Sequence, residues 1–333
     1  MRTAISKSSR RGPVIVLMAI VFTLPWAGPL TAADDGGYAG AFLRLDISAR
    51  AAGMGGTFTA IADGPTGFHY NPAGPAWVSE PVVGAAYRKM GFDRRHGSIA
   101  VLWPLRKEAA IVGSWVHAGV DNVFERDYEG EIGDEIGESN NAISFTFAKK
   151  FTSFLSLGVN LRYVQMNIAN INAYTVGFDF GAMFNLPRSA LAVGGPKGLT
   201  DFRLGLVLER INYKFPWNTY DYWVKSGESG QSFEERWPIN FRGGIAASVY
   251  DRRATLAIDI EVNEEAGSLF HGGIEVLPIP ALALRGGING EHFTAGVGIE
   301  VALGQNNLVV DYAFASTDDI IDDEHLFSLG VRF

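Results

Sequence analysis

Hydrophobic and polar residues alternate one by one along most of the chain beyond residue 80. For example, Leu155, Leu157 and Val159 alternate with Ser156 and Gly158. A period of two places successive side chains on opposite faces of a β-strand. Fourteen segments show this period, each with one large apolar face and one face of glycine, small polar and charged residues: 82–90, 95–104, 107–118, 140–149, 153–167, 171–186, 200–213, 237–250, 253–262, 267–278, 281–288, 291–303, 306–316 and 324–333.

The lengths of these segments and of their connections favour a membrane barrel over a soluble β-sandwich. Most segments supply the roughly 9–11 residues with which a tilted strand crosses the hydrocarbon layer. Alternate connections are short, whereas the opposite set contains long loops at 120–139, 214–236 and 316–324. Short periplasmic turns and long external loops are typical of bacterial outer-membrane barrels. We therefore predict an all-β fold, a transmembrane antiparallel β-barrel of about fourteen strands. The connection 187–199 is long for a periplasmic turn, which indicates a short helix there or a different strand count.

The last segment carries a pattern of its own. Phe327, Leu329, Val331 and Phe333 share one face, and smaller or polar residues occupy the other. An aromatic residue at the end of such a strand resembles the signal by which the outer-membrane assembly machinery recognises barrels. We expect these four residues to form an assembly signal. The expected partners are then the barrel assembly machinery, outer-membrane lipid and lipopolysaccharide.

The first 33 residues are not expected to belong to the fold. Four basic residues lie within the first eleven, an apolar run spans 14–24, and small residues follow at 31–33. This is the pattern of a cleaved secretory signal peptide. The sequence therefore predicts a signal at 1–33, a small N-terminal plug at 34–80 and a barrel at 81–333, exported to the outer membrane of a Gram-negative cell.

The predicted plug has a different character from the strands. It is rich in glycine and alanine, which permit tight turns and close backbone packing. Three of its motifs are ARAAGMGGTF at 49–58, AIAD at 60–63 and YNPAG at 70–74. They resemble the N-terminal signature of the PorV/PorQ family, which is akin to the FadL-type transporters of hydrophobic compounds. The resemblance covers about a tenth of the chain.

The resemblance implies a fourteen-stranded barrel closed by an N-terminal hatch, with the Asn-Pro-Ala element near a lateral opening in the wall. It also implies passive uptake of small hydrophobic molecules. In the PorV branch, the barrel instead serves a type IX secretion system and would bind secretion partners; a structural outer-membrane role is a third possibility. The plug and gate residues expected on this basis are Gly53, Met54, Gly55, Gly56, Phe68, Tyr70, Asn71, Pro72 and Ala73.

Composition excludes several other classes of function. The chain has no cysteine, so it forms no disulfide and no cysteine metal site. Removing residues 1–33 leaves 24 basic and 36 acidic residues, a net charge of −12, which argues against nucleic-acid binding. The six histidines show no metal-ligand spacing. Ser114 and His117 fall on opposite faces of one predicted strand and cannot form a catalytic dyad. We therefore expect no enzyme activity, no catalytic residue, no metal and no cofactor.

Charged residues of both signs fall on the predicted inward faces. Their mixture favours cross-strand ion pairs that stiffen the lumen and hold a plug over an ion-selective lining. Two loops remain open to more than one interpretation. The segment 121–138 is strongly acidic, and either is simply solvated or binds divalent cations that bridge to lipopolysaccharide. The segment 215–237 is rich in aromatic residues, and forms either a surface for apolar ligands or part of the aromatic girdle.

Overall fold

The computed structural model describes residues 39–106, 108–126, 129–169, 171–187, 199–223, 229–265, 267–317 and 323–333. The predicted signal peptide and the connection 188–198 lie outside the described residues, so both stay predictions. Among the described residues, no helix is long and apolar enough to cross a bilayer.

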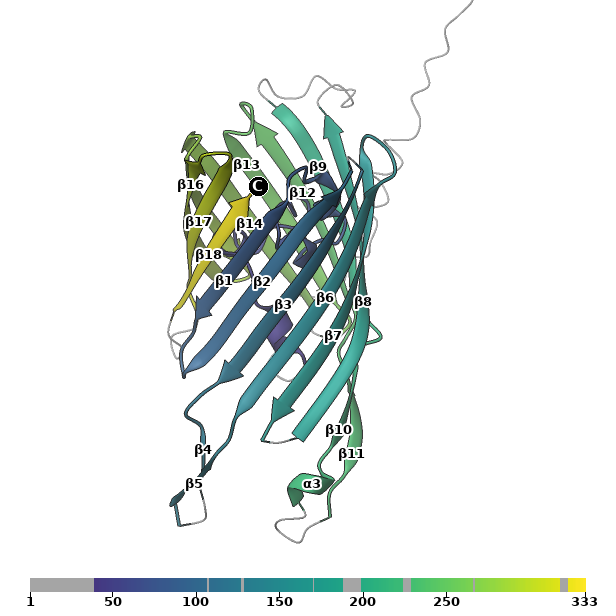
Figure 1. The fold of residues 1–333 in the computed structure, drawn as a ribbon, viewed down its shortest axis with the longest axis vertical. Helices are drawn as coiled ribbons and strands as arrows, with labels where there is room; N and C mark the ends of the chain where they lie inside the picture. The colour runs from purple at the N-terminus through teal and green to yellow at the C-terminus, as the bar shows by residue number, and fades with distance from the viewer. Residues whose placement is uncertain are drawn as a thin grey trace, which may run out of the picture. The chain divides into compact units, whose positions relative to one another are not determined.

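Fourteen antiparallel strands form a closed barrel (Figure 1). The last strand pairs with the first, from Val82 opposite Arg332 to Lys89 opposite His325, which closes the ladder. The strands follow chain order around the barrel: β1 (Val82–Lys89), β2 (Arg94–Leu105), β3 (Ala109–Val120), β6 (Glu138–Lys150), β7 (Leu155–Ile168), β8 (Ile171–Pro187), β9 (Leu199–Ile211), β12 (Asn240–Val249), β13 (Ala254–Asn263), β14 (Gly267–Ile279), β15 (Leu282–Asn289), β16 (His292–Leu303), β17 (Asn306–Ala315) and β18 (Glu324–Arg332).

The prediction of the barrel is confirmed, since each of the fourteen expected segments is one of its strands and the ends differ by three residues or fewer. Two hairpins were not predicted. Strands β4 (Phe124–Arg126) and β5 (Ile132–Glu135) pair within one long loop, and β10 (Lys214–Asn218) and β11 (Ser232–Arg236) pair within another. Both extend from the same end of the barrel, which we call the long-loop end; α3 (Tyr220–Trp223) lies near the tip of the second (Figure 1). We call the opposite end the short-turn end.

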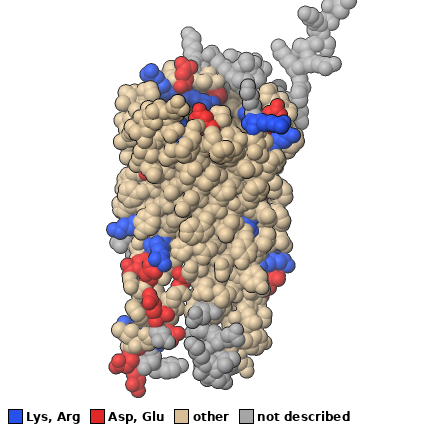
Figure 2. Space-filling model, in the orientation of Figure 1, with Lys and Arg blue, Asp and Glu red and all other residues tan. Residues whose placement is uncertain are grey.

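The outward face of the barrel is apolar. Side chains at alternate positions of each strand are exposed, and Figure 2 shows a broad band without charge between two charged ends. The predicted assembly residues Phe327, Leu329 and Phe333 lie on this face and are about half exposed, at 51%, 48% and 56%. Val331 occupies the same face by strand alternation. Where these four residues lie is thus known; their role in assembly stays a prediction.

The described part of the predicted plug, residues 39–80, lies inside the barrel (Figure 1). It contains η1 (Ala41–Arg44), α2 (Ala49–Ala52), η2 (Gly67–His69) and η3 (Gly74–Trp77). Helix α2 packs against β16, β17 and β18, whereas η3 packs against β2, β3, β6 and β7. The segment therefore spans the lumen from one wall to another.

Candidate functional site

Glycines on the inner wall receive the backbone of the plug. A Cβ atom added at Gly158 would lie within 3.0 Å of Pro72 O, one at Gly181 would meet the Asn71 side chain, and one at Gly205 would meet Thr59 O. Real Cβ atoms do not approach backbone so closely. The inward-facing glycines therefore provide the space that the plug backbone fills. This role was not predicted from the sequence, although these residues stand on the polar faces of the predicted strands.

The Asn-Pro-Ala element is a turn anchored to the wall at β7 and β8. Asn71 Nδ2 donates to Thr59 O at 2.9 Å and to Ala182 O at 3.1 Å, while its Oδ1 accepts from Ala73 N at 2.9 Å. Ser156 Oγ donates to Ala73 O at 3.0 Å. Beside this turn, the pairing of β7 with β8 runs without a break from Leu155 to Ile168. Residues 71–73 therefore anchor the plug to a continuous part of the wall, and the lateral opening that the resemblance implies is not seen in this ladder.

Three of the remaining predicted plug residues, Met54, Phe68 and Tyr70, lie in two buried clusters. Met54 and Tyr70 pack with Phe58 and Ile61 in a cluster at the centre of the plug, and Phe68 belongs to a larger apolar cluster. Gly55 and Gly56 have φ angles of +68° and +75°, which side chains other than glycine rarely adopt. Pro72 and Ala73 follow Asn71 in the anchored turn. The structure thus places seven of the nine predicted residues against two parts of the wall: 53–56 near β14–β16 and 71–73 near β7 and β8.

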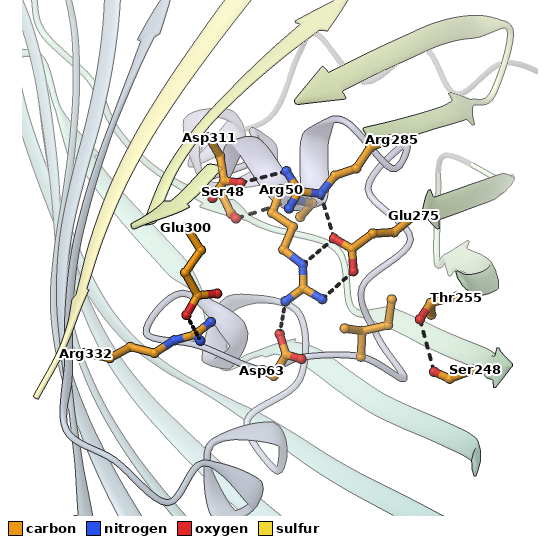
Figure 3. A network of polar contacts seen from close by, with 12 residues as sticks. Ser48, Arg50, Asp63, Ser248, Thr255, Glu275, Arg285, Glu300, Asp311 and Arg332 are labelled. Atoms are coloured by element: carbon orange, nitrogen blue, oxygen red, sulfur yellow. Dashed lines mark hydrogen bonds and ion pairs between the residues drawn. The ribbon is translucent and has the colours of Figure 1, made fainter. Parts of the chain in front are cut away.

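Arg50 of α2 connects the plug to the wall through ion pairs (Figure 3). Its Nε and Nη2 each lie 2.8 Å from an oxygen of Glu275, and its Nη1 contacts Asp63. Glu275 also accepts from Arg285 Nε at 2.7 Å, and Arg285 Nη1 lies 2.7 Å from Asp311 Oδ1. Burial lowers the pKa of Arg50, but Asp63 and Glu275 outweigh this and raise the pKa well above its ordinary value. Arg50 is therefore a fixed cation in this network.

The predicted cross-strand ion pairs are confirmed by this network and by others on the inner wall. Arg162 lies 3.4 Å from Asp179, Arg242 lies 3.3 Å from Glu261, and Arg332 lies 3.1 Å from Glu300. Arg50, the plug residue that joins these ion pairs, was not predicted from the sequence. The available signal was a single arginine within a run of alanine and glycine.

A polar cavity of about 80 Å³ lies between the plug and the long-loop end. Glu261 is its central acid, with Arg242 Nε at 3.3 Å, Arg210 Nη2 at 3.5 Å and Arg44 Nη2 at 4.0 Å. Burial lowers the pKa of Arg44 to about 10, even though Glu261 raises it. The charged and titratable lining residues are Arg44, Asp46, His69, Tyr70, Arg162, Asp179, Glu209, Arg210, Arg242, Glu261 and His271.

The position of Arg210 in this cavity could not be predicted from strand alternation. Arg210 follows the inward-facing Glu209 and would face outward in a regular strand, yet it is buried in the lumen. A register shift between Phe178 and Phe180 accommodates it, with Arg210 at φ +68° and its N–H bonded to Asp179 Oδ1 at 3.0 Å. Such a bulge turns one side chain to the other face of the strand.

His69 of the plug also lines this cavity. Burial and then Arg162 lower the pKa of His69 well below its ordinary value, so that His69 is neutral.

An apolar region covers the other side of the lumen. The inward residues of β3 are all small or apolar (Ala110, Val112, Ser114, Val116 and Ala118). Together with buried apolar residues on β2, β6, β7 and β8 they form what we call the apolar sector. Phe42, Leu43 and Phe68 of the plug fill it.

The aromatic loop divides between the lumen and the surface. Phe215, Trp217 and Trp237 are buried and cover the apolar sector at the long-loop end, together with Tyr213. Phe233 and Tyr220 are exposed, at 52% and 51%. The loop is therefore in large part a lid of buried aromatic side chains.

No group of three or more histidine, aspartate and glutamate side chains suited to a metal ion occurs among the described residues. Ser114 is buried on the inward face of β3, and His117 lies on the outward face beside Trp115 and Asn141. The two side chains are thus on opposite faces, as expected from their spacing.

The closed fourteen-stranded barrel, its apolar outer band and its filled lumen define the class of the molecule: a plugged transmembrane β-barrel of the outer-membrane type. No family model matches the sequence. No curated protein matches it either.

Solved structures share the fold. The Pseudomonas putida toluene transporter TodX is similar with a TM-score of 0.57 and 11% identity, over 86% of this chain and 98% of that chain. A Pseudomonas aeruginosa FadL homologue has a TM-score of 0.55 and 12% identity, over 86% and 98%. The CymD monoaromatic hydrocarbon channel has a TM-score of 0.55 and 11% identity, over 86% and 97%. The likeness to FadL-type channels is one of fold; the PorV/PorQ resemblance is not confirmed and stays a prediction.

Proposed function

We propose that the protein is an outer-membrane channel for the passive uptake of small hydrophobic molecules. The observation that carries the proposal is the apolar sector. A water-filled pore has a polar lumen, whereas here one side of the inner wall, from β2 to β8, presents buried apolar side chains. The fold is shared with structures named as hydrocarbon and toluene channels, which supports the proposal.

Burial in the apolar sector stabilises a hydrophobic molecule more than burial in the polar part of the lumen does. Transfer of apolar surface out of water contributes about 25 cal/mol per Å². A hydrophobic solute would therefore bind between the plug and the wall of this sector. There it would take the place of Phe42, Leu43 or Phe68 against wall residues such as Val116 and Val164. The charged cavity beside Glu261 would not receive it, because charged groups would lose solvation without gaining partners.

A pair of matched substitutions tests the proposal. Ala142 on β6 lies in the apolar sector and Ala246 on β12 lies in the central plug cluster; they are 1% and 2% exposed. Ala142→Asn places an amide in the apolar sector, and burying an amide without a partner costs about 1–3 kcal/mol. We expect uptake of a labelled aromatic hydrocarbon by cells to fall about tenfold, since 1.4 kcal/mol is a factor of ten. Ala246→Asn should leave uptake close to wild type. Equal uptake by both folded variants would contradict the proposal.

We also propose that the protein is exported by a cleaved signal peptide and inserted by the barrel assembly machinery among outer-membrane lipid and lipopolysaccharide. The apolar outer band supports this location. Membrane fractionation and gel mobility before and after boiling test it. A protein recovered in the soluble periplasmic fraction would contradict it.

A second candidate function is the binding of protein partners in secretion. The hairpins β4–β5 and β10–β11 project from the long-loop end and expose Phe124, Ile132 and Phe233. Exposed apolar side chains beside charges are typical of docking surfaces. Cross-linking in intact cells, followed by identification of captured proteins, tests this candidate. Deleting both hairpins should abolish capture if they form the docking surface.

A further inference from the structure

The lumen contains two polar regions separated by one short piece of the plug. The cavity of about 80 Å³ lies on the long-loop side and is lined in part by Gly56 and His271. The ion pairs of Arg50, Glu275 and Arg285 lie on the short-turn side (Figure 3). His271 and Glu275 share the inward face of β14 and are four residues apart, which corresponds to about 13 Å along a strand. The two polar regions are thus neighbours along one strand.

Residues 53–57 fill the gap between these regions, and we call them the seal. Gly273 stands between His271 and Glu275 on the same face of β14, and a Cβ there would lie within 3.0 Å of Met54 O. A Cβ at Gly287 on β15 would likewise lie within 3.0 Å of Gly55 N. The plug backbone therefore rests directly on the wall at this level, so its position decides whether the two polar regions connect.

The seal is held from both sides. On the cavity side, His271 Nδ1 lies 3.0 Å from Gly55 O. On the other side, Arg50 binds Glu275 in the two-pronged geometry that makes arginine–carboxylate pairs strong. Arg50 stands in α2, which ends at Ala52 directly before the seal. The Arg50–Glu275 pair, which we call the latch, therefore fixes the beginning of the seal against the wall.

We propose that the polar side of the lumen is a second pathway, which admits inorganic ions and small hydrophilic solutes when the seal leaves Gly273 and Gly287. The lining chemistry sets the class of solute. The cavity is lined by Arg44, Arg162, Arg210 and Arg242 and by Asp46, Asp179, Glu209 and Glu261. Four cationic and four anionic side chains suit hydrated ions of either sign and disfavour apolar molecules. The cavity has room for roughly five waters, at about 15 Å³ of accessible volume each.

This pathway is lined by the plug and by β7–β9 and β12–β17. It does not rest on the proposed hydrophobic uptake, because none of its charged lining residues belongs to the apolar sector. The two functions can therefore fail separately. Hydrocarbon uptake tests the apolar sector, whereas ion current through the purified full-length barrel tests the polar side.

The first experiment measures single-barrel current in planar bilayers with potassium chloride on both sides. Arg50→Ala removes the latch, and we expect the mean current to rise at least about tenfold over wild type, which equals about 1.4 kcal/mol in favour of the open seal. Arg332→Ala is the matched control. Arg332 pairs with Glu300 at 3.1 Å within the wall and belongs to the same inner surface, so its loss should leave the current unchanged (Figure 3).

The second experiment replaces the latch with a covalent bond between α2 and β18. The chain has no cysteine, so an introduced pair has no competing thiol. Ala49 of α2 lies close to β18, with Ala49 N 3.3 Å from Ser328 Oγ. In the Arg50→Ala background, the double substitution Ala49→Cys and Ser328→Cys should return the current to the wild-type level when oxidised. A reducing agent should raise the current again. Non-reducing gels report whether the bond has formed.

A folded Arg50→Ala barrel that conducts no more than wild type overturns the proposal, as does an equal rise in Arg332→Ala. A current that persists after the disulfide forms also overturns it. If Arg50→Ala does not assemble, Glu275→Gln takes its place in the same assay, since it keeps the side-chain size and removes the charge that the latch needs. A Glu275→Gln current equal to wild type would then decide against the pathway.

Discussion

The packing of the plug against wall glycines can be tested with one methyl group. Gly205 on β9 faces the lumen, and a Cβ there would lie within 3.0 Å of Thr59 O and of Thr59 C. Gly113 on β3 faces outward, and a Cβ there would have no atom within 4 Å. Gly205→Ala and Gly113→Ala therefore add the same atom to two strands of one barrel, once against backbone and once into open space.

The two substitutions should change the free energy of unfolding in opposite directions. The neighbours of Gly205 are backbone atoms, which move only if the plug moves, and overpacking of this kind costs about 1–3 kcal/mol. At Gly113 the alanine restricts the unfolded chain without a clash, which stabilises by about 0.4–1 kcal/mol. We expect the free energies of unfolding of the two variants to differ by about 1.4–4 kcal/mol, with Gly205→Ala the less stable.

Unfolding in urea, followed by the loss of the fast-migrating folded band on unheated gels, measures this difference. Limited proteolysis supplies a second readout, because a displaced plug should be cut at residues 39–80 while the strands stay protected. Equal urea midpoints together with equal proteolysis would show that the plug does not rest on the wall at Gly205, and that the wall glycines do not make room for it.

Three further predictions concern the predicted site residues. Asn71→Ala removes the side chain that donates to Thr59 O and Ala182 O, which should lower the free energy of unfolding by about 1–3 kcal/mol in the same urea assay. Tyr70→Phe removes a single bond to Asp46 Oδ1 and should lower the free energy of unfolding by less. An equal effect of the two would argue against the anchored turn. Deleting residues 53–73 should leave a folded barrel with a raised ion conductance in planar bilayers, and a folded deletion that stays closed would show that wall side chains close the lumen. Phe333→Asp removes the aromatic residue from the outward row of β18 and should lower the amount of barrel in membrane fractions, whereas normal abundance would contradict an assembly role.

The strands were predictable because lipid and lumen act on alternate residues. On β13, Leu256 and Ile258 face outward while Thr255 and Ala257 face inward. The two faces therefore differ in side-chain size and polarity, and this difference appears in the sequence as alternation. The hairpins β4–β5 and β10–β11 were not predictable in this way. All three residues of β4 are exposed, so neither face of that strand carries a burial signal.

The contacts of the plug could be predicted in kind but not in detail. The mixture of charges on the inner faces predicted ion pairs, yet Arg50 and Glu275 are 225 residues apart and nothing local connects them. The apolar sector could have been predicted from a pattern in the sequence. On β3, Val112 and Val116 stand on the face that is polar in most other strands, so this strand is apolar on both faces.

The two sides of the lumen place different constraints on the plug. Buried ion pairs add little net stability because desolvation offsets their attraction, but breaking one is costly and their geometry is specific. The latch and the pairs around Glu261 therefore fix where the plug lies more than they strengthen it. Contacts between apolar side chains are non-directional. Phe42 and Phe68 can accordingly exchange one set of apolar neighbours for another at low cost. The side that admits rearrangement is thus the side whose chemistry suits the proposed hydrophobic solute, while the ion pairs of the charged side hold the plug in register.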